Sequence, residues 1–142
     1  MTINEQQDEI IEEFEQFPDW MEKYEYIIQL GKELPLIAEE YKIDANLIRG
    51  CQSRVWLHPE YKEGKILFTA DSDALITKGL ISMVVRVLSG HSPKEIVDAD
   101  MYFINAIGLS SHLSPTRSNG LLSMVKQIKN YALAFHLQEK TA

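Results

Sequence analysis

The chain has 142 residues, 45% of them hydrophobic and 25% charged, which is the composition of an ordinary folded protein of about one domain. No stretch approaches the roughly 18 uninterrupted apolar residues of a membrane span, and the acidic N-terminus lacks the pattern of an export signal. The net charge is −7, and residues 1–44 hold 13 acidic but only 3 basic residues, which opposes general nucleic-acid binding. We therefore expect one domain over residues 1–142, located in the cytoplasm, with neither nucleic acid nor membrane as a partner.

The N-terminal part predicts two amphipathic helices. Thr2 and Glu5 have the spacing of a capping box, and the first helix is expected to run to about Phe17. Asp19 is placed to cap the second helix, which Gly31 is placed to end. Its apolar residues recur at helical spacing and predict a core-facing stripe: Trp20, Tyr24, Ile27 and Ile28.

The pattern then changes from helix to strand. A short helical turn is expected from Leu34 to about Tyr41, because Pro35 suits the first position of a helix. Three short runs rich in β-branched and aromatic residues follow, over residues 47–48, 55–57 and 66–70. Glu63–Lys65 has turn chemistry that makes the last two runs antiparallel. The expected fold is α+β, with a small antiparallel sheet of about three strands packed against helices.

The helix expected from Ala74 to Ser89 is apolar almost all round, so it should be the central core helix. Asp73 is placed to cap it and Gly90 to end it. Gly79 lies in its interior, where glycine costs about 1 kcal/mol relative to alanine, which predicts close approach of another backbone.

Three more helical pieces complete the chain. Ser92 and Pro93 predict a brief helix to about Asp98, and residues 101–107 form another short apolar piece. Ser114 is placed to cap a long final helix beginning at Pro115. One apolar face is expected along it: Leu121, Leu122, Val125, Ile128, Ala132 and Phe135.

Cys51 is the only cysteine, so no internal disulfide can form, and a reducing compartment is expected. Gly50 before it and Gln52 and Ser53 after it predict a polar turn that leads into a strand. Arg49 and Arg54 flank this loop, and nearby cations favour the reactive thiolate. The sequence thus favours an accessible nucleophile. The alternative is a small, buried and inert side chain, as lone cysteines often are.

Metal and hydrolase chemistry are poorly supported. A closed zinc site takes four ligands from Cys and His, but the chain has one cysteine and scattered histidines at 58, 91, 112 and 136. A cysteine hydrolase would need His58 or His112 beside Cys51. No second cysteine supports a dithiol cycle. No metal is expected.

Two charged residues are candidates for binding a partner protein. Arg117 lies in the first turn of the final helix, where the helix dipole disfavours a cation by about 0.3 to 1 kcal/mol. A guanidinium beside free backbone N–H groups can bind a carboxylate of a partner, although a solvent-facing arginine remains the alternative. Asp73 is explained by helix capping alone, and the resemblance given below implies the second explanation, a place near the surface that faces a partner.

Four segments in order resemble the SufE family, the sulfur-accepting partners of cysteine desulfurases. They are Gly50–Ser53 with Val55 and Trp56, Asp71–Ala74 with Lys78–Ile81, His112–Ser118 with Gly120 and Leu121, and the helix Trp20–Gly31. The resemblance covers the chain from about Trp20 to the last helix. It implies a fold similar to the U-type iron–sulfur scaffold proteins, which carry several cysteines where this chain has one.

The resemblance also implies a function. Cys51 would take sulfur as a persulfide from a SufS-type desulfurase, stimulate that enzyme and pass the sulfur to an iron–sulfur scaffold complex. Pyridoxal phosphate belongs to the desulfurase, so this chain needs no cofactor and is a carrier rather than a stand-alone enzyme. The family's cysteine is largely sheltered, which agrees with an exposed loop only if the loop moves. The alternative is an adaptor that activates a desulfurase without accepting sulfur.

Overall fold

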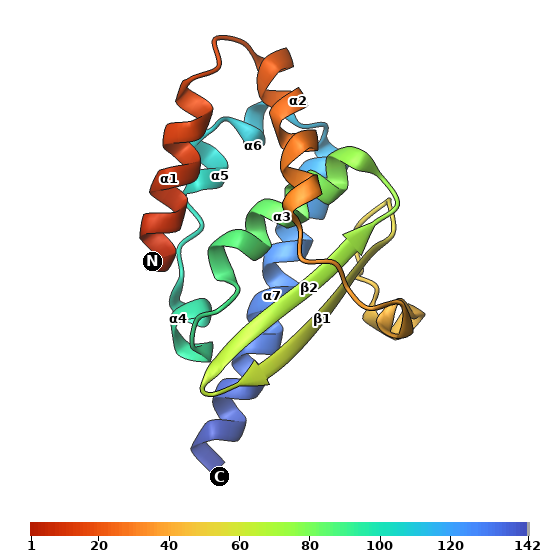
Figure 1. Cartoon of the computed structure of the whole chain (residues 1–142), viewed down its shortest axis with the longest axis vertical. Coiled ribbons are helices and arrows are strands. Elements are labelled where there is room, and N and C mark those ends of the chain that lie inside the picture. Colours follow the sequence, from red (N-terminus) through yellow and green to blue (C-terminus); the bar gives the residue numbers. More distant parts are fainter. Residues whose placement is uncertain (142) are drawn as a thin grey trace.

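A computed structural model describes residues 1–141 and shows an α+β fold, as predicted (Figure 1). A two-stranded antiparallel hairpin packs against helices, and α3 (Leu75–Leu88) crosses the middle of the molecule. This helix contacts α1, α2, β2 and the C-terminal helix α7. The element bounds are α1 Ile3–Glu15, α2 Trp20–Leu30, β1 Val55–Lys62, β2 Lys65–Ser72, α4 Pro93–Asp98, α5 Phe103–Ala106, α6 Leu109–His112 and α7 Pro115–Thr141, with 3-10 turns η1 Gly31–Glu33, η2 Glu39–Tyr41 and η3 Asp44–Asn46.

The predicted helix caps are present at the N-terminal helices. Thr2 and Glu5 form a capping box at α1, and the Asp19 carboxylate accepts the Glu22 N–H at 2.9 Å at α2. These signals act over three residues, so the local sequence alone determines them.

The predicted hairpin is present, but the prediction of a third strand at residues 47–48 is wrong. Glu63 and Gly64 have positive φ values of 53° and 79°, as a two-residue turn between antiparallel strands requires. Leu47 makes only an isolated bridge to Trp56. Gly50, with φ of 92°, turns the chain away after a single backbone bond from Ile48 N–H to the Val55 carbonyl, so this run never becomes a strand.

The helical turn expected from Leu34 is also wrong over its first half. Ala70 of β2 donates its N–H to the Pro35 carbonyl and accepts the Ile37 N–H, both at 3.1 Å, so residues 35–37 are extended. Only Glu39–Tyr41 is helical. The free edge of β2 needs hydrogen-bond partners, and supplying them outweighs the local helical preference.

The central helix α3 has the predicted close approach at Gly79. A Cβ at this position would lie 2.0 Å from the Ile27 carbonyl oxygen of α2. The backbones of α2 and α3 therefore meet where Gly79 has no room for a side chain. Two polar residues of α3 have partners: Ser82 is buried with its hydroxyl bonded to the Leu30 carbonyl, while Arg86 pairs with Glu9 and Glu13 of α1.

The C-terminal part matches the prediction except at α6 and at Leu122. Ser92 and Glu95 form a capping box on α4, which Lys129 of α7 contacts by donating to the Val97 and Ala99 carbonyls. Leu122 is exposed rather than on the core face, because the buried positions recur around a different line along α7: Gly120, Leu121, Met124, Ile128 and Ala132.

Candidate functional site

The Cys51 loop is fixed at its base by backbone bonds on both sides. Ile48 N–H donates to the Val55 carbonyl at 2.8 Å, and the Asp73 N–H donates to the Arg54 carbonyl at 3.3 Å. The Asp73 carboxylate returns this contact by accepting the Arg54 N–H at 3.1 Å. Residues 49–53 lie between these two sets of hydrogen bonds and form the tip of the loop.

The sequence predicted that Asp73 caps α3, but the structure shows that it does not. The N-cap of α3 is Ala74, which makes no side-chain capping bond, and the Ala74 N–H donates to the Ser72 hydroxyl instead. Asp73 uses its carboxylate on the loop because β2 brings it alongside Arg54, a long-range contact that no local pattern reveals.

The loop lies on the first turns of α7. Gly50 packs on Ser123, whose hydroxyl oxygen would be only 2.4 Å from a Cβ at Gly50. The Cys51 thiol donates a weak hydrogen bond to the Gly120 carbonyl, with an S···O distance of 3.5 Å. A Cβ at Gly120 would lie at an ordinary contact distance of 3.6 Å from Sγ. Gly50 is thus the glycine that lets the loop pack directly on the helix.

Cys51 is half-buried at a cavity of about 90 Å³. The walls of this cavity come from the loop, α3 and α7: Cys51, Gln52, Ser53, Thr77, Leu80, Thr116, Arg117, Gly120 and Met124. Burial raises the pKa of the Cys51 thiol. The expected thiolate-favouring effect of the flanking arginines is not seen, because desolvation dominates and both Arg49 and Arg54 are exposed.

The predicted site residues come together only in part. Gln52, Ser53 and Arg117 line the Cys51 cavity, whereas Asp73 lies at the base of the loop. Arg117 is exposed, and its guanidinium carbon lies 5.9 Å from the centre of the Tyr24 ring. The predicted cap of this helix is present, since the Arg117 N–H donates to the Ser114 hydroxyl at 3.3 Å. The site thus spans α2, the loop, α3 and α7.

Sequence reasoning missed the residues that enclose the sulfur. Thr77, Leu80 and Met124 read only as positions in apolar helices. Gly120 carried a usable signal, because a glycine inside a long helix costs about 1 kcal/mol and calls for a packing reason.

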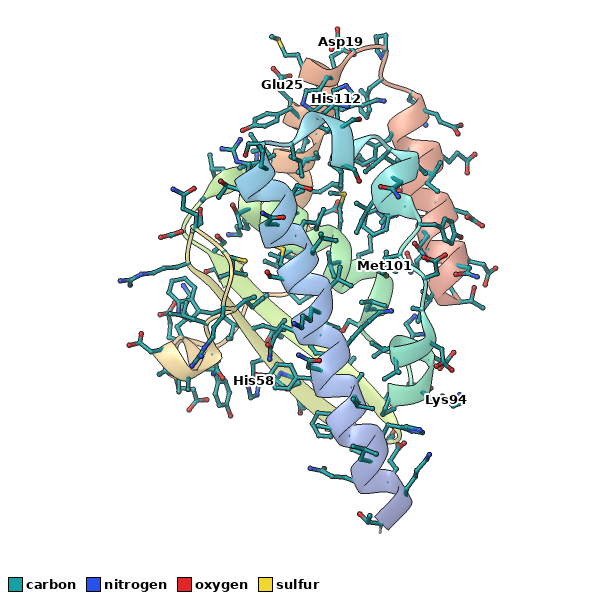
Figure 2. All side chains as sticks on the ribbon, turned by 180° about the vertical axis from the view of Figure 1, so that it is seen from behind. Asp19, Glu25, His58, Lys94, Met101 and His112 are labelled. Atoms are coloured by element: carbon teal, nitrogen blue, oxygen red, sulfur yellow. The ribbon has the colours of Figure 1, made fainter. Side chains whose placement is uncertain are left out.

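None of the four histidines, all of which lie within residues 1–141, lines the Cys51 cavity. Figure 2 shows His58 and His112 at distant parts of the molecule. The His112 ring stacks on Trp20 with centroids 4.5 Å apart, and His58 stacks on Tyr41 at 3.8 Å. Within residues 1–141, the Cys51 side chain bonds only to the Gly120 carbonyl, so the cysteine–histidine hydrolase has no base in place.

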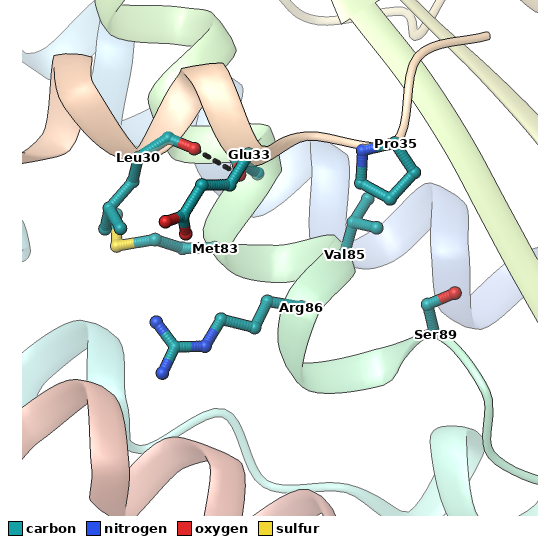
Figure 3. A pocket seen from close by; sticks show the side chains of 8 residues that line it. Leu30, Glu33, Pro35, Met83, Val85, Arg86 and Ser89 are labelled. Atoms are coloured by element: carbon teal, nitrogen blue, oxygen red, sulfur yellow. Dashed lines mark hydrogen bonds between the residues drawn. The ribbon is translucent and has the colours of Figure 1, made fainter.

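A second cavity, of about 240 Å³, lies beside the last turns of α3 and the end of α2 (Figure 3). Leu30, Met83 and Val85 give it apolar walls, and the charged side chains of Glu33 and Arg86 also line it. The part of the chain that the structure describes contains no group of three His, Cys, Asp or Glu side chains placed to hold a metal ion. None of its helices is long and apolar enough to cross a membrane.

Asp73→Ala is expected to loosen the loop. The change removes the acceptor of the Arg54 N–H, so Cys51 should react with iodoacetamide several-fold faster, while stability falls by only about 1 kcal/mol. Alkylation rates followed by mass spectrometry measure this. Asp100→Ala is the matched control, since it removes an exposed carboxylate far from the loop in sequence. An unchanged rate in Asp73→Ala would mean that the backbone bonds alone hold the loop.

The reactivity of Cys51 should depend on pH in a defined direction. Burial raises the pKa of the folded thiol, so the midpoint of its alkylation rate should lie at higher pH than in the same chain unfolded in urea. The single cysteine makes both profiles unambiguous. A folded midpoint equal to or below the unfolded one would show that the arginines outweigh desolvation.

Fold and site together define a small α+β protein with one half-buried thiol, which is carried on a loop fixed at its base and has no histidine beside it among residues 1–141. The SufE family, described as an Fe-S metabolism associated domain, matches residues 8–132, and the chain belongs to this family.

Two SufE-like relatives agree with this assignment. An uncharacterized SufE-like protein of Synechocystis sp. is 38% identical over 128 residues, covering 90% of this chain and 80% of that protein. A second, of Rhizobium etli, is 44% identical over 130 residues and covers 88% of each. The solution structure of a hypothetical protein from Thermus thermophilus has a TM-score of 0.75 at 17% identity, over 91% of this chain and 94% of that one. This last likeness supports the fold alone.

Proposed function

We propose that the protein is a sulfur carrier: Cys51 accepts sulfur from the persulfide of a SufS-type cysteine desulfurase, stimulates that enzyme and delivers the sulfur to an iron–sulfur scaffold complex. Family membership gives the coarser role in iron–sulfur metabolism. The observation that carries the finer proposal is the single thiol at the mouth of a small cavity with no base beside it. Such a thiol suits exchange with another sulfur more than attack on a carbonyl.

The transfer step balances without an added oxidant. Cys51 thiolate attacks the outer sulfur of the desulfurase persulfide, a new S–S bond forms on Cys51, and the old S–S bond breaks. The desulfurase cysteine leaves as a thiolate with the electron pair of that bond. The outer sulfur keeps its proton, so Cys51 becomes a persulfide and no net redox change occurs.

The cavity provides shelter for the transferred atom. Its volume of about 90 Å³ is well above the roughly 10–15 Å³ that one enclosed water needs, so it has room for one added sulfur atom. Exchange requires access by the attacking sulfur, and a sheltered persulfide is lost more slowly to free thiols. We propose that the loop at Arg49–Ser53 opens to let Cys51 accept the sulfur and closes to protect the persulfide from free thiols.

Pyridoxal phosphate is assigned to the desulfurase, and the carrier itself is proposed to need neither cofactor nor metal. The reaction belongs to the cytoplasm, where a lone thiol stays reduced. Arg49 and Arg54, exposed beside Cys51, are proposed to meet the partner together with Asp73 and Arg117.

Arg117→Ala should weaken docking to the desulfurase more than folding. A partner carboxylate held by the guanidinium would lose charge-assisted bonds, which predicts about a tenfold or greater loss of affinity. Stability should change by less than about 1 kcal/mol, because the exposed contact with Tyr24 is weak. Calorimetric titration and thermal unfolding test the two separately. Lys126→Ala, an exposed cation on the same helix, is the control, and equal affinity in all three proteins would remove Arg117 from the docking surface.

The proposed function is tested by mixing the purified protein with a cysteine desulfurase and free cysteine, and measuring sulfide or alanine release. A large rise in turnover is expected. No rise would contradict the proposal. A rise that persists without any transfer of sulfur to this chain would instead identify an adaptor.

A further inference from the structure

The cavity beside Cys51 contains a buried hydroxyl that folding alone does not explain. Thr77 lies in the first turn of α3, is only 7% exposed and lines this cavity. Its hydroxyl makes no hydrogen bond with any residue from 1 to 141, not even the bond to the carbonyl four residues back that helical threonines often make. The Thr77 side chain is therefore buried and unpartnered.

The Thr77 oxygen is not completely enclosed by other atoms. Among the described residues, His136 Nδ1 is the only fully enclosed side-chain polar atom without a hydrogen bond, so the unbonded Thr77 oxygen must retain some accessible surface. Thr77 as a whole is 7% exposed and borders the cavity. The cavity is thus a place from which the Thr77 hydroxyl can be given a partner.

A purely structural role would favour valine at this position. Valine has nearly the same shape and helix propensity, and it avoids the penalty of burying a hydroxyl without a partner. The other polar side chains around the cavity are at its rim: Gln52, Thr116 and Arg117 are exposed, and Ser53 is half-buried. Leu80 and Met124 offer no donor. Thr77 is therefore the buried donor of this cavity.

We propose that the Thr77 hydroxyl donates a hydrogen bond to the sulfur that Cys51 carries, and so holds the loaded persulfide as its anion inside the cavity. The inference rests on the proposed sulfur-carrier function and adds a residue to it. Once the outer sulfur has released its proton to solvent, it bears a full negative charge. A hydroxyl donor to an anion makes one of the stronger hydrogen bonds in proteins. The anionic persulfide is also a poorer target for attack by free thiols.

The contact can be tested without the desulfurase. Inorganic polysulfide loads the protein directly: Cys51 thiolate attacks a terminal sulfur of the chain, one S–S bond breaks as another forms, and a polysulfide dianion one sulfur shorter leaves. Intact mass then follows the loss of the added sulfur under dithiothreitol as a function of pH. Wild type, Thr77→Val and Thr77→Ser are compared, with thermal unfolding to confirm that each variant is folded.

Thr77→Val should lose the added sulfur about five- to tenfold faster at neutral pH, and its pH profile should move to higher pH. Thr77→Ser, which keeps the hydroxyl, should restore both. Thr77→Ala serves if the valine variant does not fold, with the same expected direction. Identical profiles in wild type and Thr77→Val would reduce Thr77 to a packing residue.

The same experiment separates this inference from the proposed function. A shifted profile together with no sulfur transfer from the desulfurase would uphold the hydroxyl contact and overturn the carrier role. Normal sulfur transfer together with an unshifted pH profile would uphold the carrier role and overturn the hydroxyl contact.

Discussion

Cys51→Ser should abolish sulfur acceptance and lower stimulation of the desulfurase by at least about 100-fold, because a serine hydroxyl at neutral pH is not a nucleophile towards sulfur without a base. Folding should be almost unchanged, within about 0.5 kcal/mol, since the side chain is half-buried and a hydroxyl can still donate to the Gly120 carbonyl. Desulfurase turnover and thermal unfolding of the variant measure the two effects.

A relocated cysteine gives the matched control. Asn130 is exposed on α7, away from the loop, so Cys51→Ser combined with Asn130→Cys keeps one thiol in the chain but removes it from the cavity. This double variant should not recover stimulation. Recovery would show that any exposed thiol suffices, and full stimulation by Cys51→Ser alone would favour the adaptor.

Gly79→Ala should destabilise the fold by about 3 kcal/mol or more. Alanine is normally favoured over glycine in a helix by about 1 kcal/mol, but here its Cβ would meet the Ile27 carbonyl oxygen at 2.0 Å. A backbone atom cannot rotate aside as a side chain can, so α2 must shift as a unit and strain the core. Urea unfolding monitored by circular dichroism measures the loss.

Gly120→Ala is the control for this prediction, since it places the same residue in another helix. Its Cβ would meet the nearest atom, Cys51 Sγ, at an ordinary contact distance of 3.6 Å, so stability should be kept or raised. Equal stability of the two alanine variants would mean that α2 and α3 are less tightly joined than the distances imply.

The fold could be predicted where structure depends on local sequence. The caps at Thr2, Asp19, Ser92 and Ser114 each act across three residues, and the hairpin depends on the Glu63–Gly64 turn. One of the errors, the helical turn expected from Leu34, has a tertiary cause. Residues 35–37 became extended because Ala70 of β2 lacked partners, which is a tertiary demand that a single-sequence pattern does not contain.

The loop at the site was predictable, but its enclosure was not. A lone cysteine between Gly50 and Gln52 indicated a polar loop, and the structure has that loop, while the role of Cys51 as a nucleophile stays a prediction. Its seat on α7, the tie from Asp73 to Arg54 and the Thr77 hydroxyl all join residues distant in sequence. The raised pKa of Cys51 follows from this enclosure. The prediction from the neighbouring arginines, which was that their charges favour the thiolate, did not take this burial into account.

Mass spectrometry of the protein after incubation with a cysteine desulfurase and free cysteine tests the central claim most directly. The carrier account predicts that the intact mass rises by one sulfur atom, that the peptide containing Cys51 holds it, and that dithiothreitol removes it. An unchanged mass while the desulfurase is stimulated, or sulfur found on any other peptide, would contradict the account.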